Sequence, residues 1–267
     1  MGGLILPPVF NKLPFELEIL FPELDGSFPN HPADPLQQEN QEYLRKRVIE
    51  VKADIGLAFD GDADRVFLLD EKGNPVSGSL TTALIADQIL NEKPGESVIY
   101  NLICSKVVPE VISAHGGKGI RSRVGHSFIK QLMEKNNAIF AGEHSGHYYF
   151  RENYRADSGV IAALVVLKAL SQHQGKLSEL LEPFSKYESS GELNFSVSDV
   201  DTSINQIAEH YKTSIVDWLD GLTVDLGDWW FNLRPSNTEP LLRLNIEAND
   251  NKICEQAIEE VRTLLSQ

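Results

Sequence analysis

Residues 54–70 read DIGLAFDGDADRVFLLD, and the rest of the chain is best interpreted outward from this stretch. The apolar run at 55–59 predicts a buried strand, and the run at 66–69 predicts a second one. Asp60, Asp62 and Asp64 stand at alternate positions between the two runs. Three carboxylates this close repel one another, which favours a bound cation among them. Oxygen ligands alone suit a hard ion such as Mg²⁺.

Two other interpretations of the acidic loop are weaker. A polar turn between strands has no need of three alternating carboxylates. A calcium-binding helix–loop–helix would use Asp60, Asp62 and Asp64 at loop positions 1, 3 and 5, and Glu71 at position 12. Its sixth position requires glycine for a sharp turn, but Arg65 stands there, and the flanking runs predict strands instead of helices.

The composition is that of a soluble globular protein. The 267 residues allow two or three domains with cores of their own, and 42% of them are hydrophobic. A formal net charge of -15 disfavours nucleic acid and anionic membranes as general partners. No apolar run has the length of a membrane span, and no basic region typical of a signal peptide opens the sequence. Cys104 and Cys254 form no metal or redox motif, which favours the reducing cytoplasm.

The predicted elements divide the chain into three parts. Residues 1–37 are rich in proline and show little periodicity, whereas 38–53 predict a helix. Helices and strands alternate from residue 75 onward, which predicts an α/β layer domain with a mostly parallel sheet. A boundary is expected near 185–191, before a small α+β unit with its helices on one side of an antiparallel sheet. Further helices are expected over 81–90, 105–115, 127–135, 158–173, 177–184, 204–211 and 251–265, and strands over 98–104, 120–124, 138–141, 193–197, 222–226, 229–233 and 241–248.

A second polar segment, GEHSGH at 142–147, follows a predicted strand. Glu143, Ser145 and His147 alternate, so an extended backbone would point their side chains to one side. An acceptor, a hydroxyl and an imidazole suit the hydroxyl groups of a sugar and include a group that transfers protons. A serine hydrolase would need the spacing G-x-S-x-G, which is absent here. A polar strand end with a hydrogen-bonded histidine is the structural alternative.

A third polar segment, RPSNTEP at 234–240, lies between two predicted strands. Arg234 offers a planar fork of donors for phosphate oxygens. Ser236, Asn237 and Thr238 add further donors, and the two prolines stiffen the loop. An ordinary turn is compatible with the same composition.

Two isolated residues are weaker candidates for phosphate binding. Lys106 stands near a predicted helix start, where most lysines are simply solvated. His126 opens another predicted helix, with Arg121 and Arg123 nearby, and the amides of a helix start favour an anion. A capping or core histidine is the ordinary role at such a position.

Taken together, FDGDADR at 59–65, GEHSGH at 142–147 and RPSNTEP at 234–240 resemble, in this order, the motifs of the α-D-phosphohexomutases, above all bacterial phosphomannomutase/phosphoglucomutase. The resemblance covers most of the chain, including FPNHPADP at 28–35. It implies mixed-sheet αβα layer domains followed by a small α+β C-terminal domain, with the loops meeting in a central cleft. It also implies an isomerase that interconverts hexose 1-phosphate and hexose 6-phosphate through a hexose 1,6-bisphosphate.

The resemblance further implies a role for each matching residue. Asp60, Asp62 and Asp64 would bind Mg²⁺. Arg65 and His147 would be catalytic, the histidine as a general acid or base near the reacting oxygen. The substrate-binding residues would be Glu143, Ser145, Arg234, Ser236, Asn237 and Thr238, together with Lys106 and His126.

One departure from the family pattern bears on activity. The phosphate donor of the family is a phosphoserine in a loop resembling TASHNP, and this sequence contains no such loop. We therefore expect the end of domain 2 over 1–74, domain 3 over 75–187 and domain 4 over 188–267, inactive alone without the N-terminal domains of the same enzyme. The alternatives are a phosphosugar-binding fragment without turnover and a phosphoglucosamine mutase. By resemblance, His144 favours glucose or mannose phosphates over glucosamine phosphate.

Overall fold

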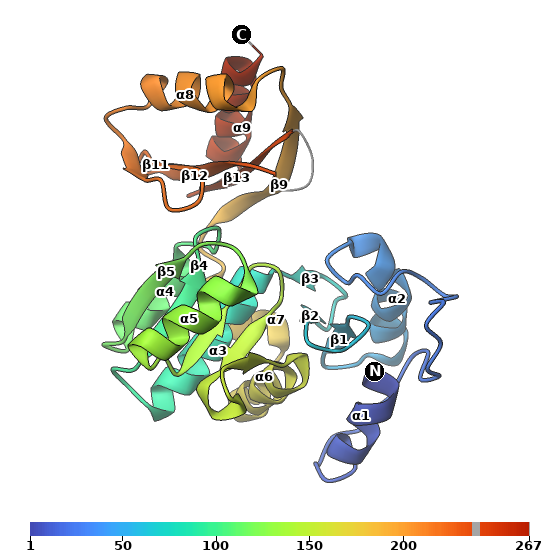
Figure 1. Cartoon of the computed structure of the whole chain (residues 1–267). Coiled ribbons are helices and arrows are strands. Elements are labelled where there is room, and N and C mark those ends of the chain that lie inside the picture. Colours follow the sequence, from blue (N-terminus) through green and yellow to red (C-terminus); the bar gives the residue numbers. More distant parts are fainter. Residues whose placement is uncertain (237–240, 267) are drawn as a thin grey trace.

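The computed structural model of the chain describes residues 1–236 and 241–266. Within these ranges it contains three sheets, which follow one another along the sequence. Figure 1 shows the unit with the first sheet beside the unit with the second, and the unit with the third sheet above them, next to the second.

The first unit is a small antiparallel sheet with helices packed beside it. Its sheet has the order β1-β2-β3, and the acidic loop joins β1 to β2. The structure confirms the two predicted strands, but residues 2–10 form a helix that the sequence pattern did not predict. This helix contains two prolines, and it is held by burial of Leu6 and Phe10 against Leu167. The elements are α1 (Gly2–Phe10), η1 (Gln38–Gln41), α2 (Glu42–Val51), β1 (Gly56–Phe59), β2 (Val66–Leu69) and β3 (Pro75–Val76).

The second unit is a five-stranded sheet covered by helices. Its order is β5-β4-β6-β7-β8, with β4 parallel to β5 and β6, and with β7 and β8 antiparallel. The sheet is therefore mixed, as the family resemblance implies: the expected parallel arrangement holds for β5, β4 and β6, whereas β7 runs against both of its neighbours because it returns directly from β6 through a tight turn. The elements are α3 (Gly78–Glu92), β4 (Ser97–Asn101), α4 (Val107–Ala114), β5 (Lys118–Ser122), α5 (His126–Asn136), β6 (Phe140–Gly142), β7 (Tyr148–Phe150), η2 (Arg151–Asn153), β8 (Ala156–Asp157), α6 (Gly159–His173), α7 (Leu177–Leu181) and η3 (Glu182–Phe184).

The first and second units share one hydrophobic core. Val66 and Leu68 of β2 and Val76 of β3 belong to the same buried cluster as Leu84 of α3 and Ala162 of α6. The start of α6 also packs tightly against the acidic loop, because a Cβ added at Gly159 would lie 2.6 Å from the backbone oxygen of Arg65. This packing fixes the position of the acidic loop relative to the second sheet.

The third unit is an antiparallel sheet of order β10-β11-β12-β13-β9, as expected for a small α+β unit. Its helices α8 and α9 pack on the sheet around a separate core that includes Ile207, Phe231 and Val261. The side chain of Asp250 caps α9 by accepting a hydrogen bond from the amide of Ile253 at 2.9 Å. The elements are β9 (Glu188–Ser196), α8 (Val200–His210), β10 (Ile215–Asp217), β11 (Leu222–Asp225), β12 (Trp229–Pro235), β13 (Leu241–Ala248) and α9 (Asn251–Leu265).

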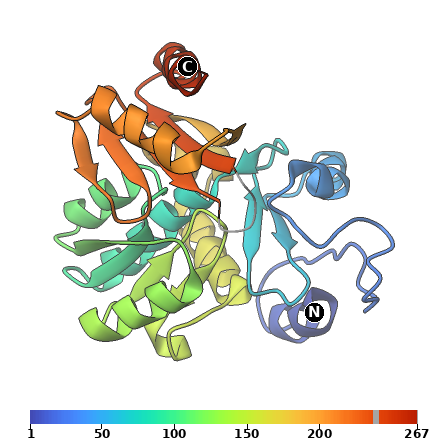
Figure 2. The same ribbon diagram turned by 45° about the horizontal axis from the view of Figure 1, so that its top comes forward.

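Polar contacts join the third unit to the second. Lys106 Nζ donates to Asp225 Oδ1 at 2.9 Å, and the amide of Val124 donates to Asp220 Oδ2 at 3.1 Å. The turned view in Figure 2 shows the third unit lying against the end of the second sheet. Among the residues that the structure describes, no helix combines the length and apolar character that a membrane span requires.

Candidate functional site

The acidic loop between β1 and β2 gathers three carboxylates at one point. Each of Asp60, Asp62 and Asp64 offers an oxygen within 4.8 Å of the other two. Ala63 has a φ of 63°, in the left-handed region, which turns the backbone between the last two aspartates. Arg65 holds Asp60 from one side, because its Nε donates to Asp60 Oδ2 at 2.7 Å and its backbone amide donates to Asp60 Oδ1 at 3.1 Å.

The electrostatics of this loop fit a divalent cation. Burial raises the pKa of Asp64 to about 6, and the adjacent charges of Asp60 and Asp62 add to the effect. Burial also acts to raise the pKa of Asp60, but the hydrogen bonds and charge of Arg65 outweigh it and lower the pKa. Asp64 Oδ1 is buried and has no hydrogen-bond partner among the described residues. A hard cation bound here would satisfy that oxygen and relieve the repulsion, so the residues present fit Mg²⁺.

The GEHSGH segment is a tight hairpin turn between β6 and β7. The amide of Glu143 donates to the carbonyl oxygen of His147 at 3.0 Å, and the amide of Gly146 donates to that of Glu143 at 3.1 Å. Gly146 has a φ of 85°, which favours glycine. The expected extended row of alternating side chains is therefore wrong. The turn still brings the groups together, since His147 Nδ1 lies 3.1 Å from Ser145 Oγ and 3.9 Å from Glu143 Oε1.

The acidic loop and the hairpin are direct neighbours. The backbones of Arg65 and His147 form an isolated antiparallel bridge, and the amide of Val66 donates to the carbonyl oxygen of Gly146 at 3.3 Å. His147 Nε2 lies 3.8 Å from Asp64 Oδ1. Burial, and then the nearby His126, lower the pKa of His147 to about 4, so its imidazole is neutral at pH 7.

Two residues that the sequence pattern did not indicate complete this region. Tyr149 OH donates to Glu143 Oε1 at 2.7 Å and lies 2.8 Å from His126 Nδ1. Asp157 Oδ2 lies 3.3 Å from the same nitrogen of His126. The alternation along β7 could have indicated Tyr149, because it stands two residues after His147 on the same face of the strand. Asp157 lies in β8, a strand that the sequence did not predict.

The phosphate-binding candidates of the third unit make their contacts within that unit. Arg234 is 7% exposed, and its guanidinium donates to Asn245 Oδ1 at 2.8 Å and to Glu192 Oε2 at 2.6 Å. Ser236 Oγ accepts a hydrogen bond from Arg243 at 3.3 Å. Two further candidates, Asn237 and Thr238, lie outside the described residues.

Two remaining candidates mark the junction of the second and third units. Lys106 uses its ammonium group to bind Asp225, and its backbone amide donates to Glu247 Oε1 at 2.8 Å. His144, in the hairpin, has its Nδ1 3.1 Å from Ser79 Oγ. Burial lowers the pKa of His144, while the charges of Glu192 and Arg234 in the third unit act on it in opposite directions. The structure therefore brings eight candidates into one region, namely Asp60, Asp62, Asp64, Arg65, His126, Glu143, Ser145 and His147.

The chain matches three models of one family. They are described as phosphoglucomutase/phosphomannomutase alpha/beta/alpha domain II over residues 1–73, alpha/beta/alpha domain III over residues 77–187 and C-terminal domain over residues 192–264. A phosphomannomutase from Methanocaldococcus jannaschii is 46% identical over 242 residues, a match that spans 91% of this chain and 54% of the relative. The chain thus spans about half the length of that curated relative.

Solved structures show the same fold. A phosphoglucomutase/phosphomannomutase family protein from Burkholderia thailandensis superimposes with a TM-score of 0.89 at 29% identity, covering 99% of this chain and 57% of the other. N-acetylphosphoglucosamine mutase from Aspergillus fumigatus, in complex with GlcNAc-6P and magnesium, gives a TM-score of 0.59 at 14% identity and covers 78% of this chain and 48% of the other. A single-residue variant of this fungal enzyme has also been solved in complex with glucose 1,6-bisphosphate.

Proposed function

The chain belongs to the phosphoglucomutase/phosphomannomutase family of phosphohexomutases, and we propose that it provides the metal-, sugar- and phosphate-binding loops of an isomerase. The reaction would interconvert hexose 1-phosphate and hexose 6-phosphate through a hexose 1,6-bisphosphate. The observation that carries this proposal is the pairing of Arg65 with His147, which sets the acidic loop against the GEHSGH hairpin. In this proposal residues 1–74, 75–187 and 188–267 correspond to the end of domain 2, domain 3 and domain 4.

Asp60, Asp62 and Asp64 are the proposed ligands of Mg²⁺. When bound, this cation would supply positive charge against the oxygens of the phosphoryl group in transfer. Arg65 has two functions in the proposal. It holds Asp60 in its ionised form through a hydrogen bond of 2.7 Å, and its guanidinium keeps positive charge beside the loop.

The hairpin would bind the sugar. Glu143 and Ser145 present an acceptor and a hydroxyl to the sugar hydroxyl groups, and Tyr149 orients Glu143 through its hydrogen bond. His147 is neutral at pH 7, so it is able to accept a proton from a hydroxyl that attacks phosphorus. The reverse transfer returns that proton to the departing oxygen.

The phosphate group that is not transferred would be held from the third unit. We propose Arg234, Ser236, Asn237 and Thr238 for this contact, with Lys106 and His126 as further phosphate-binding residues. Arg234 suits this function because its guanidinium is positioned by Asn232 on its own strand and by Asn245 on the neighbouring β13. A phosphate at this position would compete with Glu192 for the guanidinium.

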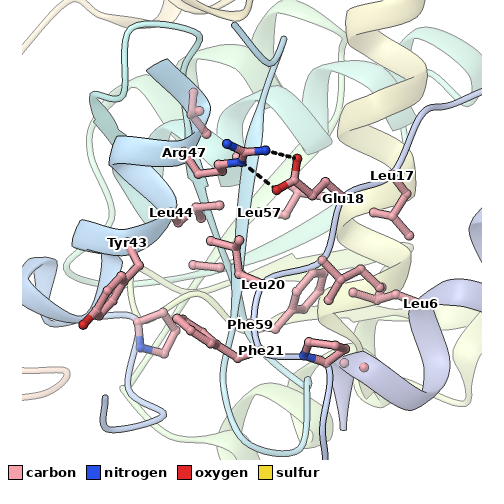
Figure 3. Close-up of a pocket in the computed structure, with 18 of the residues that line it drawn as sticks. Leu6, Leu17, Glu18, Leu20, Phe21, Tyr43, Leu44, Arg47, Leu57 and Phe59 are labelled. Atoms are coloured by element: carbon pink, nitrogen blue, oxygen red, sulfur yellow. Dashed lines mark hydrogen bonds and ion pairs between the residues drawn. The ribbon is translucent and has the colours of Figure 1, made fainter. Parts of the chain in front are cut away.

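The phosphoryl donor would come from the N-terminal domains of the same enzyme. This sequence has no TASHNP-like serine loop, and the chain spans 53% to 60% of the curated relatives named phosphomannomutase or phosphohexose mutases. A cavity of about 1140 Å³ lies along β1 and is lined by apolar residues such as Leu6, Leu44 and Phe59 (Figure 3). Among the described strands, β1 pairs with β2 alone. The first unit also exposes the large apolar residues Met1, Leu4, Phe21, Leu24, Phe28, Leu36, Tyr43, Ile49 and Val51.

This apolar surface supports docking of the proposed N-terminal domains, since exposed apolar patches mark interaction sites. We expect the chain alone to bind hexose bisphosphate with Mg²⁺ and to show no turnover. Calorimetry with glucose 1,6-bisphosphate tests binding. A coupled mutase assay, with and without the N-terminal portion of the phosphomannomutase from Methanocaldococcus jannaschii, tests turnover. Absence of bisphosphate binding in the presence of Mg²⁺ would contradict the proposal.

Two alternatives give different results in the same experiments. A phosphosugar-binding fragment would bind the bisphosphate but gain no turnover when the N-terminal portion is added. A phosphoglucosamine mutase would turn over glucosamine 1-phosphate faster than mannose 1-phosphate or glucose 1-phosphate. We propose the cytoplasm as the compartment, in keeping with the two unpaired cysteines among the described residues.

A further inference from the structure

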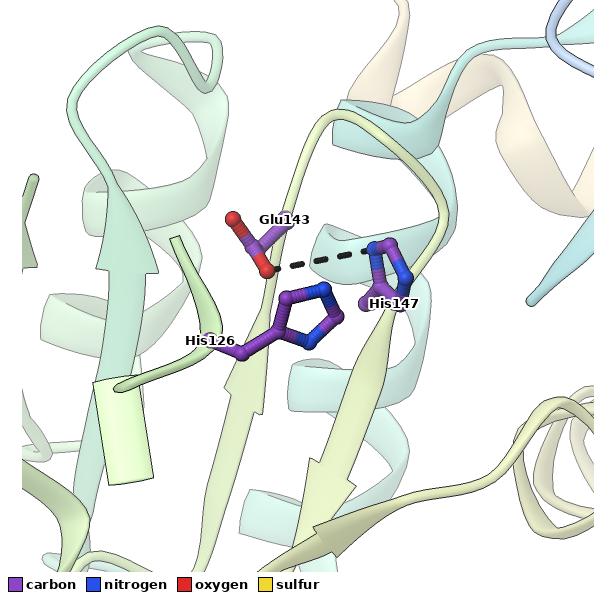
Figure 4. Close-up of side chains that lie close together, drawn as sticks. All are labelled: His126, Glu143 and His147. Atoms are coloured by element: carbon purple, nitrogen blue, oxygen red, sulfur yellow. Dashed lines mark ion pairs between the residues drawn. The ribbon is translucent and has the colours of Figure 1, made fainter. Parts of the chain in front are cut away.

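A mixed group of nitrogen and oxygen donors lies beside the acidic loop. His126, Glu143 and His147, which we call the His–Glu cluster, each offer one donor atom within 4.8 Å of the other two. Figure 4 shows the three side chains converging from the start of α5 and from the hairpin between β6 and β7. Glu143 is 2% exposed, while the side chain of His126 is 51% exposed, so the cluster has a buried base and an open side.

The donor set differs from that of the acidic loop. Two imidazoles and one carboxylate suit borderline metal ions such as Zn²⁺ and Co²⁺, whereas three carboxylates suit Mg²⁺. Tetrahedral Zn²⁺ with ligands at about 2.0–2.1 Å places its donors about 3.4 Å apart. The described positions are close to this spacing, because His147 Nδ1 lies 3.9 Å from Glu143 Oε1 and the ring centroids of His126 and His147 are 4.3 Å apart. A fourth position would stay open towards solvent.

Groups around the cluster are arranged to orient its ligands. Asp157 Oδ2 lies 3.3 Å from His126 Nδ1, and Asp64 Oδ1 lies 3.8 Å from His147 Nε2. Both carboxylate oxygens are buried and have no hydrogen-bond partner among the described residues, and the side chain of Asp157 is only 10% exposed. Asp157 is placed to hold the ring nitrogen of His126 that lies opposite the metal, as outer carboxylates do at histidine–metal sites.

We propose that the His–Glu cluster is a second metal site, distinct from the acidic loop, that takes a divalent transition-metal ion of the Zn²⁺ type. The ion would bind through one nitrogen of His126, one oxygen of Glu143 and the Nδ1 of His147. Occupancy would inhibit the isomerase, because it removes Glu143 and His147 from the sugar. This inhibition rests on the proposed function, whereas the metal binding does not.

Cobalt is a suitable probe because its visible absorption reports the ligands and their geometry. The full chain, held in excess Mg²⁺, would be titrated with Co²⁺. We expect one Co²⁺ per chain with the intense visible bands of a low-coordinate site, and loss of these bands on addition of Zn²⁺. The variant His126→Asn should weaken Co²⁺ binding by more than about tenfold. His147→Asn should do the same, and melting curves would confirm that both variants fold.

Two control variants separate this site from the acidic loop. His173→Asn changes an exposed histidine at the end of α6 and should leave Co²⁺ binding unchanged. Asp62→Asn should weaken Mg²⁺ binding and leave the Co²⁺ bands intact. If excess Mg²⁺ displaces Co²⁺, or if Asp62→Asn abolishes the bands while His126→Asn does not, the second site does not exist. Because the readout is spectroscopic, the absence of mutase activity would count against the proposed function and not against this site.

Discussion

The backbones of Arg65 and His147 pair with each other although 81 residues lie between them in the sequence. Their pairing joins the loop that gathers three carboxylates to the turn that gathers an acid, a hydroxyl and an imidazole. Neither segment could form the candidate site alone, because each is only a short loop between two strands. The geometry of the candidate site therefore depends on a few backbone contacts between Arg65–Val66 and Gly146–His147.

Replacement of Gly146 by alanine should disturb this junction. Its φ of 85° is unfavourable for alanine, and an added Cβ would lie 2.6 Å from the ring of Phe67. We expect Gly146→Ala to reduce the free energy of unfolding by about 2–4 kcal/mol, the sum of backbone strain and a clash in a packed core. Gly191→Ala is the matched control, since Gly191 has a φ of 65° but no atom within 4 Å of the added Cβ. Urea unfolding compares the two, and equal losses would show that the contact with Phe67 is not a constraint.

Magnesium should stabilise the chain more at neutral than at acidic pH. The folded pKa of Asp64 is raised to about 6, so the folded chain binds this proton more tightly than the unfolded chain does. Without metal, the contribution of Asp64 to stability therefore falls as the pH rises from about 4 to about 6. Bound Mg²⁺ relieves that penalty, and we expect a larger rise in melting temperature at about pH 7.5 than at about pH 5.

The variant Asp62→Asn tests whether the acidic loop is the site of this effect. It should weaken Mg²⁺ binding about tenfold or more, as measured by the melting temperature against Mg²⁺ concentration. Asp54→Asn removes an exposed carboxylate just before β1 and should leave Mg²⁺ binding unchanged. If both variants bind Mg²⁺ equally well, the cation stabilises the chain from a site other than the acidic loop.

His147 should titrate well below an ordinary histidine. Its folded pKa is lowered to about 4, so the unfolded chain binds the proton more tightly. The stability of the folded state is therefore lost as the pH falls from about 6.5 towards 4. Proton NMR of the imidazole measures the titration directly, and His147→Gln should reduce the loss of stability over this interval. A midpoint near 6.5 would contradict the effect of burial on the ring.

Arg234→Ala should weaken the binding of glucose 1,6-bisphosphate by roughly 2–5 kcal/mol, as expected for loss of a buried charge partner. Arg234→Lys keeps the charge but loses the planar fork, and should fall between the wild type and the alanine variant. Arg262→Ala, on the exposed face of α9, is the control. Calorimetry gives the dissociation constants, and melting curves test whether the variants fold. If a folded Arg234→Ala variant has an unchanged dissociation constant for glucose 1,6-bisphosphate, Arg234 is not part of the phosphate site.

Sequence patterns predicted most of the elements because each has a clear period or cap. The final helix illustrates this point, since Asp250 provides the cap and the expected range of 251–265 is the observed one. The short strands β7, β8 and β10 were not predicted, because two or three residues carry no readable period. Helix α1 forms although it contains two prolines, which disfavour a helix, and burial of Leu6 and Phe10 explains why it forms.

The candidate site was predictable as three polar segments but not as a geometry. The alternation in GEHSGH suggested an extended strand, whereas Gly146 allows a turn that brings the same side chains together. Asp157 escaped prediction because only the tertiary structure reveals the pairing of β8 with β7, whereas Tyr149 was missed although it stands two residues after His147 in the sequence. The residue roles implied by the family resemblance stay predictions until the variants above are measured.

The core shared by the first two units has a consequence for how the chain melts. Since β2 and β3 bury side chains against α3 and α6, we expect the acidic loop and the second sheet to unfold together. The third unit has its own core and joins the second through β9 and polar contacts such as Lys106 with Asp225. Scanning calorimetry should accordingly resolve two cooperative transitions, one for the first two units together and one for the third, although the sequence divides into three parts.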